Sequence, residues 1–280
     1  MATDLAAVLA EERRIMNLYA PDYDAATRTN SYVYQIERSQ FIEWITKTLR
    51  DAGRDPRELS VLEAGCGTGS VLDRLAQAGF GRLTGLDLAE GMLLQARKRR
   101  LPQAGWTRAL IEDPPFRSEV FDVILACFTL HHLYDPQAFF RLVDRTLRPE
   151  GWFFVLEYNA DSGMLERSGG GVRRSLGGLV RSLFAFKNRR ALVSRPILPF
   201  LQNPAHRQLG FGAIRQAMAH PERYEIRREL RGLLLPTMLP VLIEESAFDR
   251  TVARWAGAAD RHLERRFGGL FQWIAGRRRL

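Results

Sequence analysis

Cysteine is nearly absent from the sequence: there are only two, Cys66 and Cys127, in 280 residues, too few for a disulfide framework. The chain also lacks the run of about 18 uninterrupted apolar residues that a membrane-spanning helix needs. Its most apolar segment, residues 233–243, is shorter and contains two prolines. The first residues include acidic side chains and no long apolar core, which argues against a signal peptide. We therefore expect a cytoplasmic protein in a reducing compartment.

Lysine and histidine are scarce as well. Only three of the 41 basic residues are lysines, and three of the five histidines, His206, His220 and His262, are scattered without the spacing of a zinc site. We therefore expect no bound metal. The formal net charge is +9, but residues 1–159 carry 19 basic and 22 acidic side chains, net −3, whereas residues 160–280 carry 22 and 10, net +12. The uneven charge indicates that the two parts are specialised differently.

The composition, 46% hydrophobic and 26% charged, is that of a globular protein and excludes a disordered or collagen-like chain. Short apolar runs predict strands at 59–62, 83–86, 106–111, 121–126 and 152–158. Amphipathic segments predict helices at 31–50, 71–76, 90–100 and 135–147. This alternation indicates an α/β fold with a mostly parallel, doubly wound (Rossmann-like) sheet. Ligands of such sheets bind at the carboxyl ends of the strands.

A glycine-rich segment, VLEAGCGTGS at 61–70, follows the first predicted strand. Gly65, Gly67 and Gly69 allow the backbone to approach a ligand where a Cβ atom would collide. Their G-x-G-x-G spacing, preceded by Glu63, differs from the dinucleotide pattern G-x-G-x-x-G. A carboxylate repels a pyrophosphate but attracts a ligand that carries an ammonium group. The alternative is a tight strand-to-helix turn that binds nothing.

The second predicted strand ends on Asp87, about 20 residues after the glycine loop, which is the interval expected for a carboxylate that binds a ribose. Such a carboxylate can accept hydrogen bonds from both ribose hydroxyls. The alternative is that Asp87 caps the helix that follows. Together with the glycine loop, the position of Asp87 favours an adenosine-containing cofactor.

Four segments carry a resemblance to a known family: VLEAGCGTG at 61–69, TGLDLAEGML at 84–93, EDPPFRSEVFDVILACFTLHHL at 112–133 and LRPEGWFFVLE at 147–157. In this order they resemble the class I S-adenosylmethionine-dependent methyltransferases, in the branch of small bacterial enzymes with a ubiquinone-biosynthesis-like core. The resemblance covers residues 55–158. It implies S-adenosylmethionine as the cofactor and a seven-stranded sheet, completed by strands at 224–230 and 270–275 with the last one antiparallel.

The resemblance also implies roles for individual residues. Glu63, Gly65 and Gly67 are expected to hold the methionine part of the cofactor, and Cys66 and Gly69 belong to the same loop. Asp87 is expected to bind the ribose, with Leu88 and Met92 beside the adenine.

One position departs from the family pattern. The family places an acid at the end of the third strand, one residue after a glycine, to bind the adenine amine. The matching residues here are Ala109 and Leu110. We expect the backbone at Ile111, or the carboxylates of Glu112 and Asp113, to replace that hydrogen bond.

The fourth predicted strand leads into His131 and His132, a stretch that lies between cofactor and acceptor in the family. Either imidazole can serve as a general base, because its pKa lies near neutrality. The alternative is that one histidine caps the following turn while the other packs or bonds to backbone. Cys127 is expected to form a small wall of the pocket, since methyl transfer needs no covalent enzyme intermediate.

The expected domain organisation has four parts. Residues 1–54 form a helical lid in which Tyr23 covers the cofactor, because an aromatic face attracts a sulfonium, or else anchors the first helix. Residues 55–159 form the cofactor-binding core. Residues 160–204 form an inserted helical cap whose basic amphipathic helix faces the acceptor, a membrane surface or simply the core. Residues 205–280 complete the sheet.

The expected activity is transfer of a methyl group, most simply to oxygen, on a small-molecule or lipid-like biosynthetic intermediate. Peripheral contact with an anionic membrane surface is a further expectation. An RNA methyltransferase is an alternative because of the basic second part, but CFTLHHL at 127–133 lacks the Asn/Asp-Pro-Pro-aromatic signature of base methylation. A cofactor-binding scaffold without catalysis is the other alternative.

Overall fold

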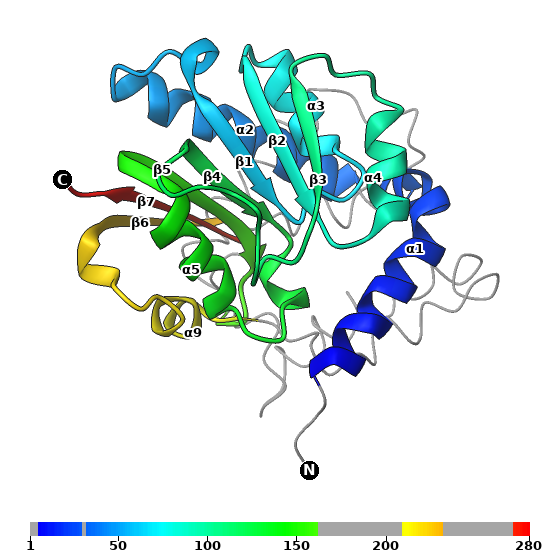
Figure 1. The fold of residues 1–280 in the computed structure, drawn as a ribbon. Helices are drawn as coiled ribbons and strands as arrows, with labels where there is room; N and C mark the ends of the chain where they lie inside the picture. The colour runs from blue at the N-terminus through cyan, green and yellow to red at the C-terminus, as the bar shows by residue number, and fades with distance from the viewer. Residues whose placement is uncertain (1–4, 30–31, 162–208, 232–270) are drawn as a thin grey trace, which may run out of the picture.

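The computed structural model describes residues 5–29, 32–161, 209–231 and 271–280 (Figure 1). Its helices are α1 (Leu5–Thr29), α2 (Tyr32–Asp51), α3 (Ser70–Gln77), α4 (Glu90–Arg97), α5 (Gln137–Thr146) and α9 (Phe211–Gln216). Its strands are β1 (Ser60–Ala64), β2 (Arg82–Asp87), β3 (Ala104–Arg108), β4 (Phe121–Cys127), β5 (Leu147–Tyr158), β6 (Tyr224–Arg231) and β7 (Phe271–Arg278).

The seven strands form one sheet in the order β3-β2-β1-β4-β5-β7-β6. The pairs from β3 to β5 are parallel, whereas β7 runs antiparallel to both of its neighbours (Figure 1). This confirms the predicted fold class and the two predicted late strands, the last of them antiparallel. The strand order reverses between β1 and β4, so their carboxyl ends border the crevice where open α/β sheets bind ligands.

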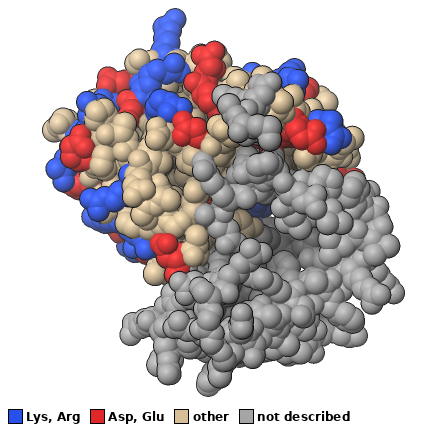
Figure 2. All heavy atoms as spheres, turned by 90° about the horizontal axis from the view of Figure 1, so that it is seen from below, with Lys and Arg blue, Asp and Glu red and all other residues tan. Residues whose placement is uncertain are grey.

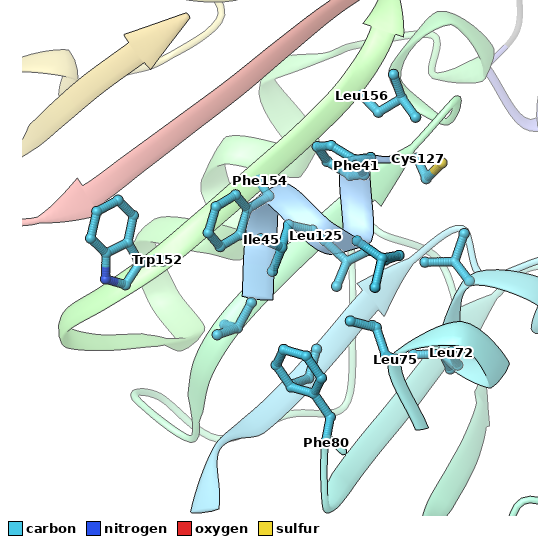
Figure 3. Close-up of a cluster of buried hydrophobic side chains, with 14 of the residues drawn as sticks. Phe41, Ile45, Leu72, Leu75, Phe80, Leu125, Cys127, Trp152, Phe154 and Leu156 are labelled. Carbon is cyan, nitrogen blue, oxygen red and sulfur yellow. The ribbon is translucent and has the colours of Figure 1, made fainter. Parts of the chain in front are cut away.

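Two apolar clusters cover the two faces of the sheet, because successive strand residues point to opposite sides. One cluster packs α2 and α3 against the sheet, and Figure 3 shows Phe41 and Ile45 of α2 beside Phe154 of β5. The other packs α5 and α9 against the opposite face and includes Phe139 and Ile214. The sheet is therefore a rigid support, and the loops at its carboxyl edge are held from both sides.

Some element boundaries differ from the prediction. The strand expected at 106–111 is β3, Ala104–Arg108, because the chain turns after it and the Asp113 amide donates to the Leu110 carbonyl at 3.3 Å. The helix α4 ends at Arg97 rather than at residue 100, and the chain then turns with a φ of 52° at Arg100. The strand β5 begins at residue 147 rather than 152, and its pairing with β4 has a register irregularity between Leu147 and Trp152.

The predicted insertion at 160–204 lies almost entirely outside the described residues, so its helix is not tested. The residues just after β5 and those at the start of α9 lie next to each other. A carboxylate oxygen of Asp161 accepts a hydrogen bond from the Phe211 amide at 2.9 Å. Among the helices that the structure describes, none combines the length and apolarity needed to cross a bilayer.

Candidate active site

A cavity lies at the carboxyl ends of β1, β2 and β4 and is closed on one side by α1. Twelve of the fourteen residues predicted for the site line it: Tyr23, Glu63, Gly65, Cys66, Gly67, Asp87, Leu88, Met92, Ile111, Glu112, Cys127 and His132. Gly69 and His131, the other two, are not among its lining residues. The residues that sequence patterns single out one by one are thus brought together in a single place.

Two glycines of the loop after β1 are needed for different steric reasons. A Cβ atom on Gly67, whose φ is 52°, would meet no atom within 4 Å and would point into open space. A Cβ atom on Gly69 would instead lie 2.6 Å from the Trp106 ring, so this glycine allows β3 to pack on the loop. Gly67 is therefore the position where a ligand can approach the backbone.

Glu63, at the carboxyl half of β1, is a buried acid without a full set of partners. Its side chain is 2% exposed, and Oε2 has no hydrogen-bond partner among the described residues. Burial raises the pKa of this carboxyl well above its ordinary value, while the positive charge of Arg38 opposes the shift. A buried oxygen of this kind stays favourable only with a donor, and a ligand ammonium group is a suitable one.

Arg38 of α2 faces the same cavity and is 6% exposed. Its guanidinium interacts with Tyr23 and with Cys127, and its Nε has no hydrogen-bond partner among the described residues. A carboxylate and a guanidinium that line one cavity match the ammonium and carboxylate of an amino acid. The pair of Glu63 and Arg38 therefore fits the methionine end of the expected cofactor.

Asp87 ends β2, and its carboxylate has the predicted capping role while also lining the cavity. Its Oδ1 accepts a hydrogen bond from the Ala89 amide and its Oδ2 one from the Gly67 amide, both at 2.8 Å. The carboxylate thus orders the turn into α4 and also lines the cavity. Burial raises its pKa, and the two amide hydrogen bonds oppose that shift. Each carboxylate oxygen keeps acceptor capacity for a ligand hydroxyl.

The side of the cavity next to Asp87 suits an adenine. Met92 of α4 and Leu88 of the turn before that helix line it, and Leu110, Ile111 and Glu112 line it from the loop after β3. Asp113, which the sequence offers as another replacement for the missing adenine acid, is not among the lining residues. Of the three groups expected to bind the adenine amine in place of the family's acid, the Ile111 backbone and the Glu112 carboxylate therefore belong to residues that line the cavity.

The two histidines occupy a short 3₁₀ turn, Leu130–His132, after β4. The His131 Nδ1 lies 2.9 Å from Oε2 of Glu157, a fully buried acid of β5 that also accepts from the Leu130 amide at 2.9 Å. Burial opposes ionisation of Glu157, but the neighbouring His131 outweighs it and lowers the pKa of this carboxyl. His131 therefore fixes the turn rather than facing the cavity.

His132 does face the cavity. Its Nδ1 lies 3.0 Å from Oε1 of Glu12 in α1, and its ring centroid is 4.1 Å from that of His131. Burial is the largest cause that lowers the pKa of His132, and the nearby His131 adds to it, whereas Glu12 acts in the opposite direction. A lowered pKa keeps the imidazole neutral near pH 7, the form that can accept a proton.

The helix α1 is tied across the cavity by polar contacts. Asn17 accepts a hydrogen bond from the Gly91 amide at 2.7 Å, which joins α1 to α4. Asp24 accepts one from the Thr68 hydroxyl at 2.6 Å, which joins α1 to the glycine loop, and pairs with Arg99 as well. Lining residues of α1 such as Met16 are held over the cavity in this way.

Sequence patterns did not single out Arg38 or Glu12. For Arg38 a signal exists: it lies three and seven residues before Phe41 and Ile45, so an arginine occupies the apolar face of its helix. For Glu12 the sequence offers none, because its partner lies 120 residues away. Within the described residues there is no group of three His, Cys, Asp or Glu side chains arranged to hold a metal ion.

At its switch point the Rossmann-like sheet carries the glycine loop, the acid Asp87 and the pair of Glu63 and Arg38. This arrangement fits an adenosyl amino acid. Residues 62–155 match the family model described as a methyltransferase domain. This segment is therefore a methyltransferase domain, and the cavity fits S-adenosylmethionine, the cofactor of the class I methyltransferases that the sequence resembles.

Individual relatives agree with this assignment. Over 152 residues the chain is 29% identical to the ubiquinone/menaquinone biosynthesis C-methyltransferase of Roseobacter denitrificans, covering 52% of this chain and 58% of that protein. Over 104 residues it is 32% identical to the ubiquinone biosynthesis O-methyltransferase of Hydrogenovibrio crunogenus, covering 36% and 43%. The chain thus spans about half the length of these curated relatives.

A solved structure shares the fold. A S-adenosylmethionine-dependent methyltransferase of Thermotoga maritima, described as a possible histamine N-methyltransferase, aligns with a TM-score of 0.58 and 17% identity. The alignment covers 95% of this chain and 99% of that one. The names of these relatives include C-, O- and N-methyl transfer, so the acceptor atom has to be argued from the site.

Proposed function

We propose that the protein methylates a hydroxyl oxygen of a small, partly apolar biosynthetic intermediate. The observation that carries the proposal is the position of His132 in the same cavity as Glu63, Arg38 and Asp87. A hydroxyl oxygen must lose its proton when it is methylated, so a neutral imidazole at this place is useful for an oxygen acceptor. The likeness to ubiquinone biosynthesis methyltransferases supports a small or lipid-like acceptor.

The residues of the chain divide into those that hold the cofactor and those that serve the acceptor. Glu63 would hold the ammonium group, Arg38 the carboxylate and Asp87 the ribose hydroxyls, while Met92 and Ile111 enclose the adenine. When bound, S-adenosylmethionine supplies an electrophilic methyl group, which an acceptor oxygen takes in one displacement. The protein's part is to align the acceptor and exclude water.

The acceptor side of the cavity is defined by α1 and the turn after β4. Leu9 and Met16 of α1 and Leu133 line it together with His132. Apolar walls with a few polar groups, here His132 and Glu12, suit a hydroxylated ring or a short lipid-like chain. In this arrangement His132 takes the proton of the acceptor hydroxyl, and the new oxygen–carbon bond replaces the oxygen–hydrogen bond.

The RNA alternative has no specific support in the described residues. Figure 2, which views the molecule from below, shows Lys and Arg side chains interspersed with Asp and Glu side chains among the described residues. Several arginines are neutralised within the protein, as in the pairs of Arg54 and Arg148 with Asp122 at 3.0 and 2.7 Å. These pairs lie in the part of the chain before residue 160. Most of the basic second part, on which the RNA alternative rests, lies outside the described residues.

The proposal is tested by supplying S-adenosylmethionine with a deuterated methyl group to the protein in a metabolite extract and in a panel of phenols, quinols and amines. Mass spectrometry should find the labelled methyl group as a methyl ether on a small hydroxylated compound. The Asp87→Ala variant should form this product more slowly at the same cofactor concentration. Label found only on nitrogen, on carbon or on added RNA would contradict O-methylation.

A further inference from the structure

The contact between His132 and the lid helix has a consequence for catalysis. We propose that Glu12 of α1 is a positioning residue that orients His132, so that the base of the site is complete only while α1 covers the cavity. This inference rests on the proposed function, because it assigns His132 the proton of the acceptor. It adds a residue that lies outside the matched family region, residues 62–155.

The geometry of the pair is that of a buried, directed contact. Oε1 of Glu12 lies 3.0 Å from Nδ1 of His132, and both residues line the cavity. The side chains are 12% and 20% exposed, so water screens the pair far less than it screens a surface ion pair. The contact joins residues 120 positions apart, and it exists only because α1 lies across the turn after β4.

The chemistry of the two groups fixes which imidazole nitrogen is basic. A carboxylate only accepts hydrogen bonds, so Nδ1 of His132 carries the proton in this contact. The lone pair is then on Nε2, which is the nitrogen that can take a proton from an acceptor. Without Glu12 the ring is free to hold its proton on either nitrogen, and only part of the molecules have the productive form.

The charges around the ring give Glu12 a second effect. His132 is surrounded by His131 of the same turn, by Glu12 of α1 and by Glu157 of β5. Glu157 is already engaged by the His131 Nδ1 at 2.9 Å. Of these two described acids, Glu12 is the one hydrogen-bonded to His132, and its negative charge favours the imidazolium that forms when His132 takes a proton.

The same helix also covers the cofactor side. Met16 and Tyr23 of α1 line the cavity, and Asn17 and Asp24 fasten the helix to α4 and to the glycine loop. A single position of α1 thus closes the cofactor region and orients the base. The arrangement protects the protein from activating an acceptor while the cavity is open.

The test compares Glu12→Ala and Glu12→Gln with Glu11→Gln, a neighbouring exposed acid that pairs with Arg14 on the surface at 2.6 Å. Nitrogen NMR of the His132 ring, recorded with S-adenosylhomocysteine bound, should show the Nδ1–H tautomer in the native protein. Glu12→Ala should lose the preference, and Glu12→Gln should keep it, because the amide oxygen still accepts. Glu11→Gln should change neither the tautomer nor the titration.

Kinetics on an accepted substrate give the second readout. Glu12→Ala should lower kcat by about 100-fold and Glu12→Gln by about tenfold, with the affinity for S-adenosylhomocysteine within threefold of native. Removing the carboxylate lowers the pKa of His132, so the acidic limb of the kcat profile should move to lower pH in Glu12→Gln.

Two results would overturn the inference. One is an unchanged His132 tautomer and titration in Glu12→Ala. The other is a loss of cofactor affinity as large as the loss of kcat, because that result makes Glu12 a general support of the lid. The NMR readout needs no acceptor, so it decides the Glu12–His132 pairing even if the proposed O-methylation is wrong.

Discussion

Oδ2 of Asp87 accepts a hydrogen bond from the Gly67 amide at 2.8 Å, and this bond joins the loop after β1 to the end of β2. The other carboxylate oxygen accepts from the Ala89 amide at the same distance. The acid that the sequence suggests as a ribose ligand therefore also sets the shape of the glycine loop. Cofactor binding and loop order are linked through this one side chain.

Replacing Asp87 with alanine should weaken the binding of S-adenosylhomocysteine by about 1–3 kcal/mol, the usual effect of losing charge-assisted hydrogen bonds. Calorimetry at constant ionic strength measures the change. Asp51→Ala serves as the control, because Asp51 pairs with Lys47 on the surface and does not line the cavity. Unchanged affinity in a folded Asp87→Ala protein would remove Asp87 from the site.

A side chain at position 67 should block the cofactor. Gly67→Ala adds a methyl group at a residue that lines the cavity, and no protein atom lies within 4 Å of the added group. The matched control is Gly53→Ala, because Gly53 also has a positive φ, 74°, and open space around it but does not line the cavity. Both variants should lose about 1–2 kcal/mol of stability from the backbone conformation. Only Gly67→Ala should lose binding of S-adenosylhomocysteine, and equal binding by the two variants would contradict the assignment.

Glu63 should reduce the stability of the ligand-free protein as the pH rises. Burial raises the pKa of this carboxyl above the ordinary 4.5, so the folded protein keeps its proton to higher pH than the unfolded chain does. The contribution of Glu63 to stability is fully present below the unfolded pKa and is lost as pH rises through the folded one.

The Glu63→Gln variant removes that titration. Its melting temperature should exceed that of the native protein by more at pH 8 than at pH 5, while its affinity for S-adenosylhomocysteine falls roughly 10- to 100-fold. Glu58→Gln, at an exposed acid, is the control. A melting difference that is the same at both pH values would show that Glu63 does not titrate as proposed.

The two thiols should be inert in the folded protein. Burial raises the pKa of Cys127 to about 12 and that of Cys66 well above its ordinary value. Because the thiolate is the reactive form, a disulfide reagent at pH 8 should modify the native protein on the order of 100-fold more slowly than the unfolded chain. Cys127→Ser should retain methyl transfer. Rapid labelling, or complete loss of activity in Cys127→Ser, would give the cysteine a chemical role.

The core of the fold was predictable because its strands end in residues with a distinct chemistry. Glu63 and Asp87 each follow a short apolar run, and their spacing fits two adjacent parallel strands. The end of β3 was harder to predict. The turn after Arg108 includes a hydrogen bond between Leu110 and Asp113, and residue propensities do not indicate it. Boundaries that depend on tertiary contacts are where the prediction differed from the structure.

The polar partners in the site were harder to predict than its lining. The spacing of the glycine loop predicted that all three glycines make room for a ligand. At Gly69, however, a Cβ atom would collide with the Trp106 ring of β3. The need for glycine there becomes visible only in the packed sheet. Similarly, His131 and His132 are equivalent in the sequence. Their separation into a structural and a cavity-facing residue depends on Glu157 and Glu12, which approach from two other elements.

The most direct test of the central claim, that S-adenosylmethionine binds in the cavity below α1, is photochemical labelling. The native protein is irradiated with S-adenosylmethionine carrying a labelled methyl group, and the labelled peptides are identified by mass spectrometry. The label should fall on peptides that contain cavity residues such as Tyr23 and Cys127, and S-adenosylhomocysteine should prevent it. Label confined to peptides away from the cavity, or label that S-adenosylhomocysteine does not displace, would contradict the account.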